Sequence, residues 1–177
     1  MVLLGAVTVL LTEALGPFHL LRRAPLAIAW IGVALAASGF AYRRRAALAA
    51  MWPGVARPNF ETAIAAIATS FAAGIAGIVA LIAVISPPNS ADAMAYHLPR
   101  VVYWAQSGSV AFFPTPYFNQ ITLQPLAEYI MLHTYVLSGG DHFINLVACA
   151  AFVGSMVGVS AIALVALLVG WLNHPTR

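Results

Sequence analysis

A short segment in the middle of the chain carries four chemically versatile side chains at helical spacing. On an ideal helix, Asp92 and Tyr96 lie about 40° apart and Asp92 and Arg100 about 80° apart. His97 and Arg100 are three residues apart, so they are neighbours on a helix surface. We therefore expect one helix to present a carboxylate, a phenol, an imidazole and a guanidinium around one side.

These four groups suit the transfer of a group to a hydroxyl acceptor. The Asp92 carboxylate can take a proton from a hydroxyl as general base. Arg100 can hold a phosphate by two parallel hydrogen bonds and stabilise the charge that grows on it, and His97 and Tyr96 can add further donors. The alternative is that Asp92 only caps its helix, where a negative charge favours the positive end of the helix dipole. The spacing alone leaves both interpretations open.

Two helices must position these groups. The first is predicted from Ser90 to about Gln106, with a bend at Pro99. Asn89 is its expected N-cap, and Asp92, three residues later, completes a pattern like the capping box of helix N-termini. The second is predicted over 123–137.

The second helix has three polar positions. Tyr129 and His133 share a face at a spacing of four, whereas Glu128 points elsewhere, and we expect two solvated positions and one buried hydrogen bond. No histidines and carboxylates have the spacing of a metal site, so no cofactor is expected, although a divalent metal could assist the chemistry.

The composition indicates a membrane protein. Hydrophobic residues make up 62% of the 177 residues and charged residues 7%, and the mean hydropathy is +0.91. A soluble domain typically has about a quarter charged residues. The net charge of +3 comes with no basic stripe interleaved with aromatic residues, which argues against nucleic-acid binding. Cys149 is a single cysteine, so no disulfide framework is indicated.

About four transmembrane helices are predicted, within an all-α membrane protein. A bilayer core about 30 Å thick needs roughly 20 apolar residues, and four runs meet or approach that length. The first contains Glu13 and Pro17 and has no basic residue before it, so we expect a retained helix rather than a cleaved signal peptide. The predicted helices span 2–21, 25–42, 62–85 and 143–172, and the polar loop between the last two spans 86–142.

The arginines predict the orientation. Arg43, Arg44, Arg45 and Arg57 lie between the second and third predicted helices, which places that loop in the cytoplasm. The loop 86–142 then lies on the extracytoplasmic side, and both termini are cytoplasmic.

Several strings of residues resemble a known family. They are Pro87-Pro88-Asn89, then Asp92-x-x-x-Tyr96-His97-Leu98-Pro99-Arg100-Val101, Trp104, Gly108-Ser109-Val110, Pro125-Leu126-Ala127-Glu128-Tyr129, Ser138-Gly139-Gly140-Asp141 and Asn145-Leu146-Val147. In these strings the chain resembles bacterial polytopic glycosyltransferases of the GT-C class, which are similar to the family 39 membrane mannosyltransferases and to aminoarabinosyltransferases. Those enzymes use polyprenyl-phosphate sugars as donors.

The resemblance implies a site and a location. It makes Asp92 the catalytic acidic residue of the first large external loop and Tyr96, His97 and Arg100 candidates for binding the donor phosphate, while Glu13 and Glu128 match the pattern without an assigned role. It implies a multi-pass protein of a bacterial inner membrane, with membrane lipids and a polyprenyl-phosphate sugar as partners. Members of the family have more membrane helices, so residues 1–177 are expected to form an N-terminal module whose missing C-terminal part is a further partner.

The expected reaction is therefore an inverting sugar transfer in the cell envelope, from the polyprenyl phosphate to a hydroxyl acceptor. Two alternatives are a non-enzymatic membrane scaffold or subunit, and a small transporter with Glu13 lining its pathway. In an enzyme, Asp92 and Arg100 are expected to converge on one open cavity, whereas in a scaffold they point apart or are capped.

Overall fold

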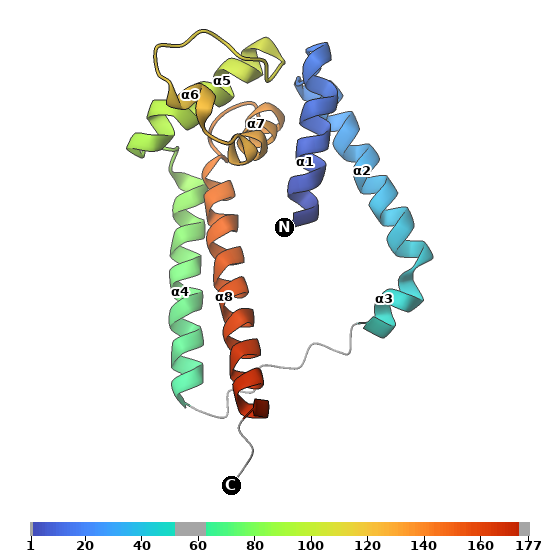
Figure 1. Cartoon of the computed structure of the whole chain (residues 1–177), viewed down its shortest axis with the longest axis vertical. Coiled ribbons are helices and arrows are strands. Elements are labelled where there is room, and N and C mark those ends of the chain that lie inside the picture. Colours follow the sequence, from blue (N-terminus) through green and yellow to red (C-terminus); the bar gives the residue numbers. More distant parts are fainter. Residues whose placement is uncertain (1, 52–62, 174–177) are drawn as a thin grey trace.

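The protein is built from helices. The computed structural model describes residues 2–51 and 63–173, and all the regular structure within them is helical (Figure 1). In chain order the helices are α1 (Val2–Leu15), η1 (Gly16–Phe18), α2 (Arg23–Arg43), α3 (Arg45–Met51), α4 (Ala63–Ile85), η2 (Ala93–His97), α5 (Leu98–Ser107), α6 (Asn119–Thr122), α7 (Leu126–Ser138) and α8 (Asn145–Asn173).

Three of the described helices, α2, α4 and α8, are long and apolar enough to cross a membrane. At 1.5 Å per residue, the 23 residues of α4 extend about 35 Å, which exceeds a hydrocarbon core of about 30 Å. No more than 6% of any of the three spans is buried inside the protein, so their apolar side chains face outward. Such surfaces are stable in lipid, and the protein is membrane-embedded.

The first predicted span is shorter than expected. Helix α1 ends at Leu15 instead of Leu21, and its 14 residues extend only about 21 Å. Pro17, which has no N–H to donate, converts the continuation into the single 3₁₀ turn η1. His19 then adopts a left-handed conformation (φ 56°), which turns the chain towards α2.

The bounds of the other three spans are close to those predicted. Helix α2 extends over 23–43 rather than 25–42, and α4 begins at Ala63, beside the predicted Thr62, which lies outside the described residues. Helix α8 starts two residues late because Ile144 N–H donates to the Asp141 carbonyl in a preceding turn. The side-chain amide of Asn145 donates to the carbonyl of Ser86 at 2.8 Å, which ties the start of α8 to the end of α4.

The buried core lies outside the three spans. Helices α5, α6 and α7 gather at one end of the α4–α8 pair, and the corner between α1 and α2 packs against them (Figure 1). The loop 86–142 is thus a small packed unit rather than two separate helices on a membrane surface. The core side chains are Leu21, Val101, Trp104, Phe113, Tyr129, Leu132 and Ile144.

A π-helical turn replaces the bend predicted at Pro99. Proline cannot donate to the carbonyl four residues earlier, which is that of Ala95. Residues Ala93–His97 widen into the π turn η2, in which Leu98 N–H donates to Ala93. The Ala95 carbonyl instead accepts a hydrogen bond from the side-chain amide of Gln120 at 2.9 Å. Pro99 is therefore accommodated without an unpaired carbonyl, and α6 is attached to α5.

The second predicted helix corresponds to α7, and a short helix that was not predicted precedes it. This helix, α6, covers only Asn119–Thr122, and Leu123 after it is extended (ψ 147°). Helix α7 then begins at Leu126, three residues later than predicted, with Pro125 just before its first turn. It ends at Ser138, and Gly139, whose φ is +85°, forms a left-handed cap after it.

Gly108 fixes the α1–α2 corner to the end of α5. Its φ is +69°, and its carbonyl accepts a hydrogen bond from Leu21 N–H at 3.1 Å. The imidazole Nδ1 of His19 donates to the carbonyl of Ser107 at 2.8 Å. A Cβ added to Gly108 would lie 2.7 Å from the carbonyl oxygen of His19, which leaves no room for a side chain.

Replacing Gly108 with alanine is expected to destabilise the protein by about 2–3 kcal/mol, because left-handed strain adds to the clash with the His19 carbonyl. Gly139→Ala is the matched control, since Gly139 also has positive φ but no atom within 4 Å of an added Cβ. It should cost about 1 kcal/mol. Thermal unfolding in detergent measures both, and equal losses would contradict the docked corner.

Candidate functional site

Glu128 is the centre of a buried polar cluster. Its side chain is fully buried on α7, and its Oε1 accepts hydrogen bonds from Arg100 Nη1 and from His97 Nδ1, both at 3.1 Å. Because a carboxylate only accepts, His97 must carry a proton on Nδ1. Two of the three polar positions of this helix, Glu128, Tyr129 and His133, were predicted to be solvated, but all three are buried.

Arg100 is held as a structural cation rather than as a free phosphate ligand. Only 2% of it is exposed, and besides Glu128 it donates from Nε to the Gln120 carbonyl and from Nη1 to the Leu123 carbonyl at 3.0 Å. Its guanidinium lies over the ring of Trp104, 5.2 Å from the centroid. These contacts link α5 to α7 and to the segment between α6 and α7, so Arg100 fixes the position of His97 through Glu128.

Asp92 does not cap its helix. The residue that caps is Ser90, whose hydroxyl oxygen accepts a hydrogen bond from Ala93 N–H at 3.2 Å, one position after the predicted Asn89. The Asp92 side chain makes no capping hydrogen bond and is exposed. Together with His97 it lines a cavity of about 290 Å³, the Asp92 cavity, whose far wall includes Ile144 and Asn145.

Asp92 and Arg100 do not converge on one cavity. Arg100 lines a different and larger space of about 490 Å³, so the convergence expected for an enzyme is not found. Eight residues separate the two, a rise of about 12 Å along a helix. That the two side chains line separate cavities agrees with what the scaffold alternative predicts, whereas the absence of capping by Asp92 and its place in a cavity with His97 do not.

Tyr96 lies beside His97, with ring centroids 4.0 Å apart. Desolvation, and then the nearby Asp92 carboxylate, raise the pKa of the Tyr96 phenol. The Tyr96 phenol is therefore a neutral hydrogen-bond donor close to Asp92 and His97, which both line the Asp92 cavity.

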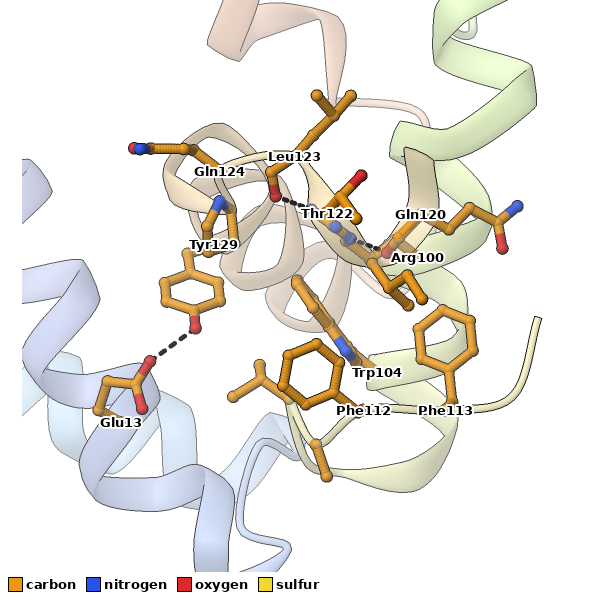
Figure 2. Close-up of a pocket in the computed structure, with 14 residues that line it drawn as sticks. Glu13, Arg100, Trp104, Phe112, Phe113, Gln120, Thr122, Leu123, Gln124 and Tyr129 are labelled. Carbon is orange, nitrogen blue, oxygen red and sulfur yellow. Dashed lines mark hydrogen bonds between the residues drawn. The ribbon is translucent and has the colours of Figure 1, made fainter. Parts of the chain in front are cut away.

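The larger space, the Glu13 cavity, lies between α1, α5, α7 and the loop after α5 (Figure 2). Tyr129 donates from its hydroxyl to Glu13 Oε1 at 2.6 Å. Burial, and then this hydrogen bond, raise the pKa of the Tyr129 phenol, so it remains protonated. Glu13 therefore does face a polar cavity, which is the condition that the transporter hypothesis required.

His133 joins α1, α2 and α7 as a neutral imidazole. Trp30 Nε1 donates to His133 Nδ1 at 3.0 Å, so Nδ1 carries no proton. His133 Nε2 must then donate to Thr12 Oγ1 at 2.9 Å, while the Thr12 hydroxyl donates to the Thr8 carbonyl at 2.8 Å. Tyr129 and His133 share a face, as predicted, and that face is directed towards Glu13 and Thr12 of α1.

Acid is expected to weaken the packing of α1 and α2 through His133. Burial lowers its pKa from 6.5 to about 4, so the folded protein binds fewer protons than the unfolded chain between these values. Stability contributed by neutral His133 is present above pH 6.5 and is lost as the pH falls towards 4, on the order of 2 kcal/mol. Unfolding in detergent between pH 7.5 and 4.5 measures this loss.

His133→Gln should flatten this pH dependence, because glutamine can accept from Trp30 and donate to Thr12 without titrating. His142→Gln is the control, since His142 is exposed and should leave the slope unchanged. An unaltered slope in His133→Gln would contradict the assignment.

An apolar groove of about 800 Å³ runs between α1, α7 and α8. Its walls are apolar side chains and glycine, among them Val9, Ile130 and Val147. Along α1 it ends one helical turn before Glu13, and on α7 and α8 its residues Ile130 and Val147 are next to Met131 and Ala148 of the Asp92 cavity. The groove and the Asp92 cavity are thus lined by different faces of the same two helices, α7 and α8.

The sequence predicted that Asp92, Tyr96 and His97 lie near one another, but it did not predict the role of Glu128. Its partners lie 28 and 31 residues earlier, on another helix. The signal that could have indicated the pairing was a carboxylate and an arginine, each on a short helix with an apolar face, in a loop with few other charges.

No protein-family model, curated protein or solved structure matches the chain.

Proposed function

We propose that the protein is a membrane glycosyltransferase that moves a sugar from a polyprenyl-phosphate donor to a hydroxyl acceptor. The observation that carries the proposal is the Asp92 carboxylate, which is exposed, is not used as a cap, and shares a cavity with His97 just beyond the end of α4. A general base must be accessible and have an unengaged carboxylate oxygen. The strings of residues around Asp92 that resemble GT-C glycosyltransferases add to this support.

In the proposed mechanism Asp92 takes the proton of the acceptor hydroxyl while the hydroxyl oxygen attacks the anomeric carbon of the sugar. The bond from this carbon to the phosphate oxygen breaks with inversion, and the lipid phosphate leaves as an anion without needing a proton. The Tyr96 phenol is a nearby donor to steady it, and His97, whose Nδ1–H is held by Glu128, adds an Nε2–H when its imidazole is doubly protonated. Arg100, proposed from the sequence to bind the phosphate, becomes a positioning residue that holds His97 through Glu128.

The apolar groove supports a donor with a long hydrocarbon chain. Burying a methylene group from water is worth about 0.8 kcal/mol, and a prenyl chain offers many such groups. Residues of α7 and α8 line both the groove and the Asp92 cavity, and in this proposal a chain in the groove extends past these helices to bring its phosphate to His97.

The proposal includes an orientation and a location. With Arg43, Arg44 and Arg45 in the cytoplasm, α4 crosses the membrane outward and α8 returns. The loop 86–142 and its two cavities then lie on the extracytoplasmic face of a bacterial inner membrane, and α1 is a fourth membrane-inserted helix that does not span the core alone.

A transfer assay tests the function. Membranes containing the protein are incubated with radiolabelled polyprenyl-phosphate sugars and extracted lipid and saccharide acceptors. Transfer of label from at least one donor, absent from membranes without the protein, is expected. No transfer from any donor would contradict the proposal.

A further inference from the structure

The walls of the Glu13 cavity combine aromatic rings with hydrogen-bonding groups. The rings of Trp104, Phe112 and Tyr129 border it together with the Glu13 carboxylate and the side chain of Gln124 (Figure 2). Its volume of about 490 Å³ falls within the range of about 300–1,000 Å³ for small-molecule sites. Such walls suit a ligand that has both hydroxyl groups and apolar faces.

One carboxylate oxygen at this cavity has unused hydrogen-bonding capacity. The indole Nε1 of Trp104 is buried without an acceptor among the described residues, so Trp104 offers a ligand its ring rather than its N–H. Glu13 uses Oε1 for Tyr129, and within the described chain its Oε2 has no donor. A ligand hydroxyl can therefore donate to Glu13.

Phe112 supplies an open aromatic face. Its side chain is 87% exposed although it borders the cavity, whereas the neighbouring Phe113 is buried in the core. The electron-rich face of an aromatic ring attracts the slightly positive C–H groups of an apolar surface. The C–H face of a sugar ring matches it.

The charge at the cavity disfavours anions. Arg100 is neutralised by Glu128, and no cation of the described residues pairs with Glu13. Glu13 therefore leaves the wall with one uncompensated negative charge. A phosphate or a uronic acid would be repelled, while a neutral sugar or a protonated amino sugar would not.

We propose that the Glu13 cavity is a saccharide-binding site, separate from the Asp92 cavity, which takes neutral or amino sugars and rejects anionic ones. A sugar hydroxyl donates to Glu13, and the sugar ring packs on Phe112. The site binds without reaction, so it does not depend on the proposed transfer.

Direct binding tests the site. The purified chain in detergent is titrated with methyl glucoside, glucosamine, glucuronate and inorganic phosphate, and binding is followed by saturation-transfer NMR and calorimetry. We expect the first two to bind at least about tenfold more tightly than the last two, which corresponds to about 1.4 kcal/mol. No saccharide binding, or tighter binding of phosphate, would overturn the proposal.

Three variants locate the binding. Glu13→Gln keeps an acceptor for Tyr129 but removes the charge, so glucuronate should bind about as well as methyl glucoside. Phe112→Ala should weaken every sugar by about tenfold without affecting folding, because the ring is exposed. Phe118→Ala is the control, since Phe118 is also exposed but does not border the cavity, and sugar binding should be unchanged.

Each variant result decides the proposal. Sugar binding that is unaltered in both Glu13→Gln and Phe112→Ala would place the sugar elsewhere and overturn it. Asp92→Asn should bind sugars as the wild type does. Saccharide binding without any transfer would leave this site standing and count against the proposed function alone.

Discussion

Replacing Glu128 with leucine is expected to cost about 3–5 kcal/mol of stability. The change leaves the Arg100 guanidinium, which is 2% exposed, without its carboxylate, and it removes the acceptor of His97 Nδ1. An uncompensated buried cation is among the most costly defects in a folded protein because its lost hydration is no longer offset. Unfolding of the variant in detergent, by heat or by added SDS, measures the loss.

A double-mutant cycle separates the charge effect from the loss of packing. Arg100→Met in the Glu128→Leu background removes the unpaired charge and should recover part of the stability. Recovery is incomplete because the carbonyls of Gln120 and Leu123 lose a donor. Glu13→Gln is a matched control at an exposed carboxylate and should cost little. Additive losses from Arg100→Met and Glu128→Leu would contradict the buried ion pair.

Replacing Asp92 with asparagine is expected to lower the transfer rate by about 10²–10⁴-fold, the usual contribution of a general base. Folding should be unchanged because the Asp92 side chain is exposed and makes no capping hydrogen bond. The rate of label transfer in membranes and the unfolding temperature of the purified variant measure the two effects.

Ser90→Ala is the matched control for Asp92→Asn. It removes the observed cap and should cost about 1 kcal/mol of stability. Because Ser90 also lines the Asp92 cavity but carries no base, it should lower the transfer rate far less than Asp92→Asn does. If Asp92 served only the helix terminus, the results would be exchanged: Asp92→Asn would lower stability and keep full transfer.

Long apolar runs predicted the membrane helices well, because length and hydropathy alone decide whether such a helix is stable in lipid. The bounds of α4 and α8 are therefore close to those expected. The exception is α1, where apolar side chains continue to Leu21 but the backbone cannot remain α-helical through Gly16 and Pro17. The apolar composition of residues 2–21 favoured a helix over the whole run. Pro17 has no N–H to donate to the preceding turn, so the α-helix ends earlier.

The candidate site was predicted in part. Local spacing indicated that Asp92, Tyr96 and His97 would be neighbours, but it assumed regular 100° steps, and the π turn at Ala93–His97 breaks that regularity. The pairing of Arg100 with Glu128 depends on how α5 packs on α7, which no local pattern specifies. For this reason the sequence assigned Arg100 to a phosphate, whereas tertiary packing engages it with a carboxylate and two carbonyls.

Helices α1 and α2 form an N-terminal hairpin, and its contacts set an order of events during biosynthesis. The bonds from Thr12, Glu13 and Trp30 reach partners on α7 that lie 121, 116 and 103 residues later in the chain. At about 5–20 residues per second, translation delivers those partners on the order of 10 s after the hairpin has emerged. Until then the hairpin has none of these bonds, so α1 and α2 can dock only after α7 has been synthesised, and assembly of the N-terminus is a late step in the maturation of the protein.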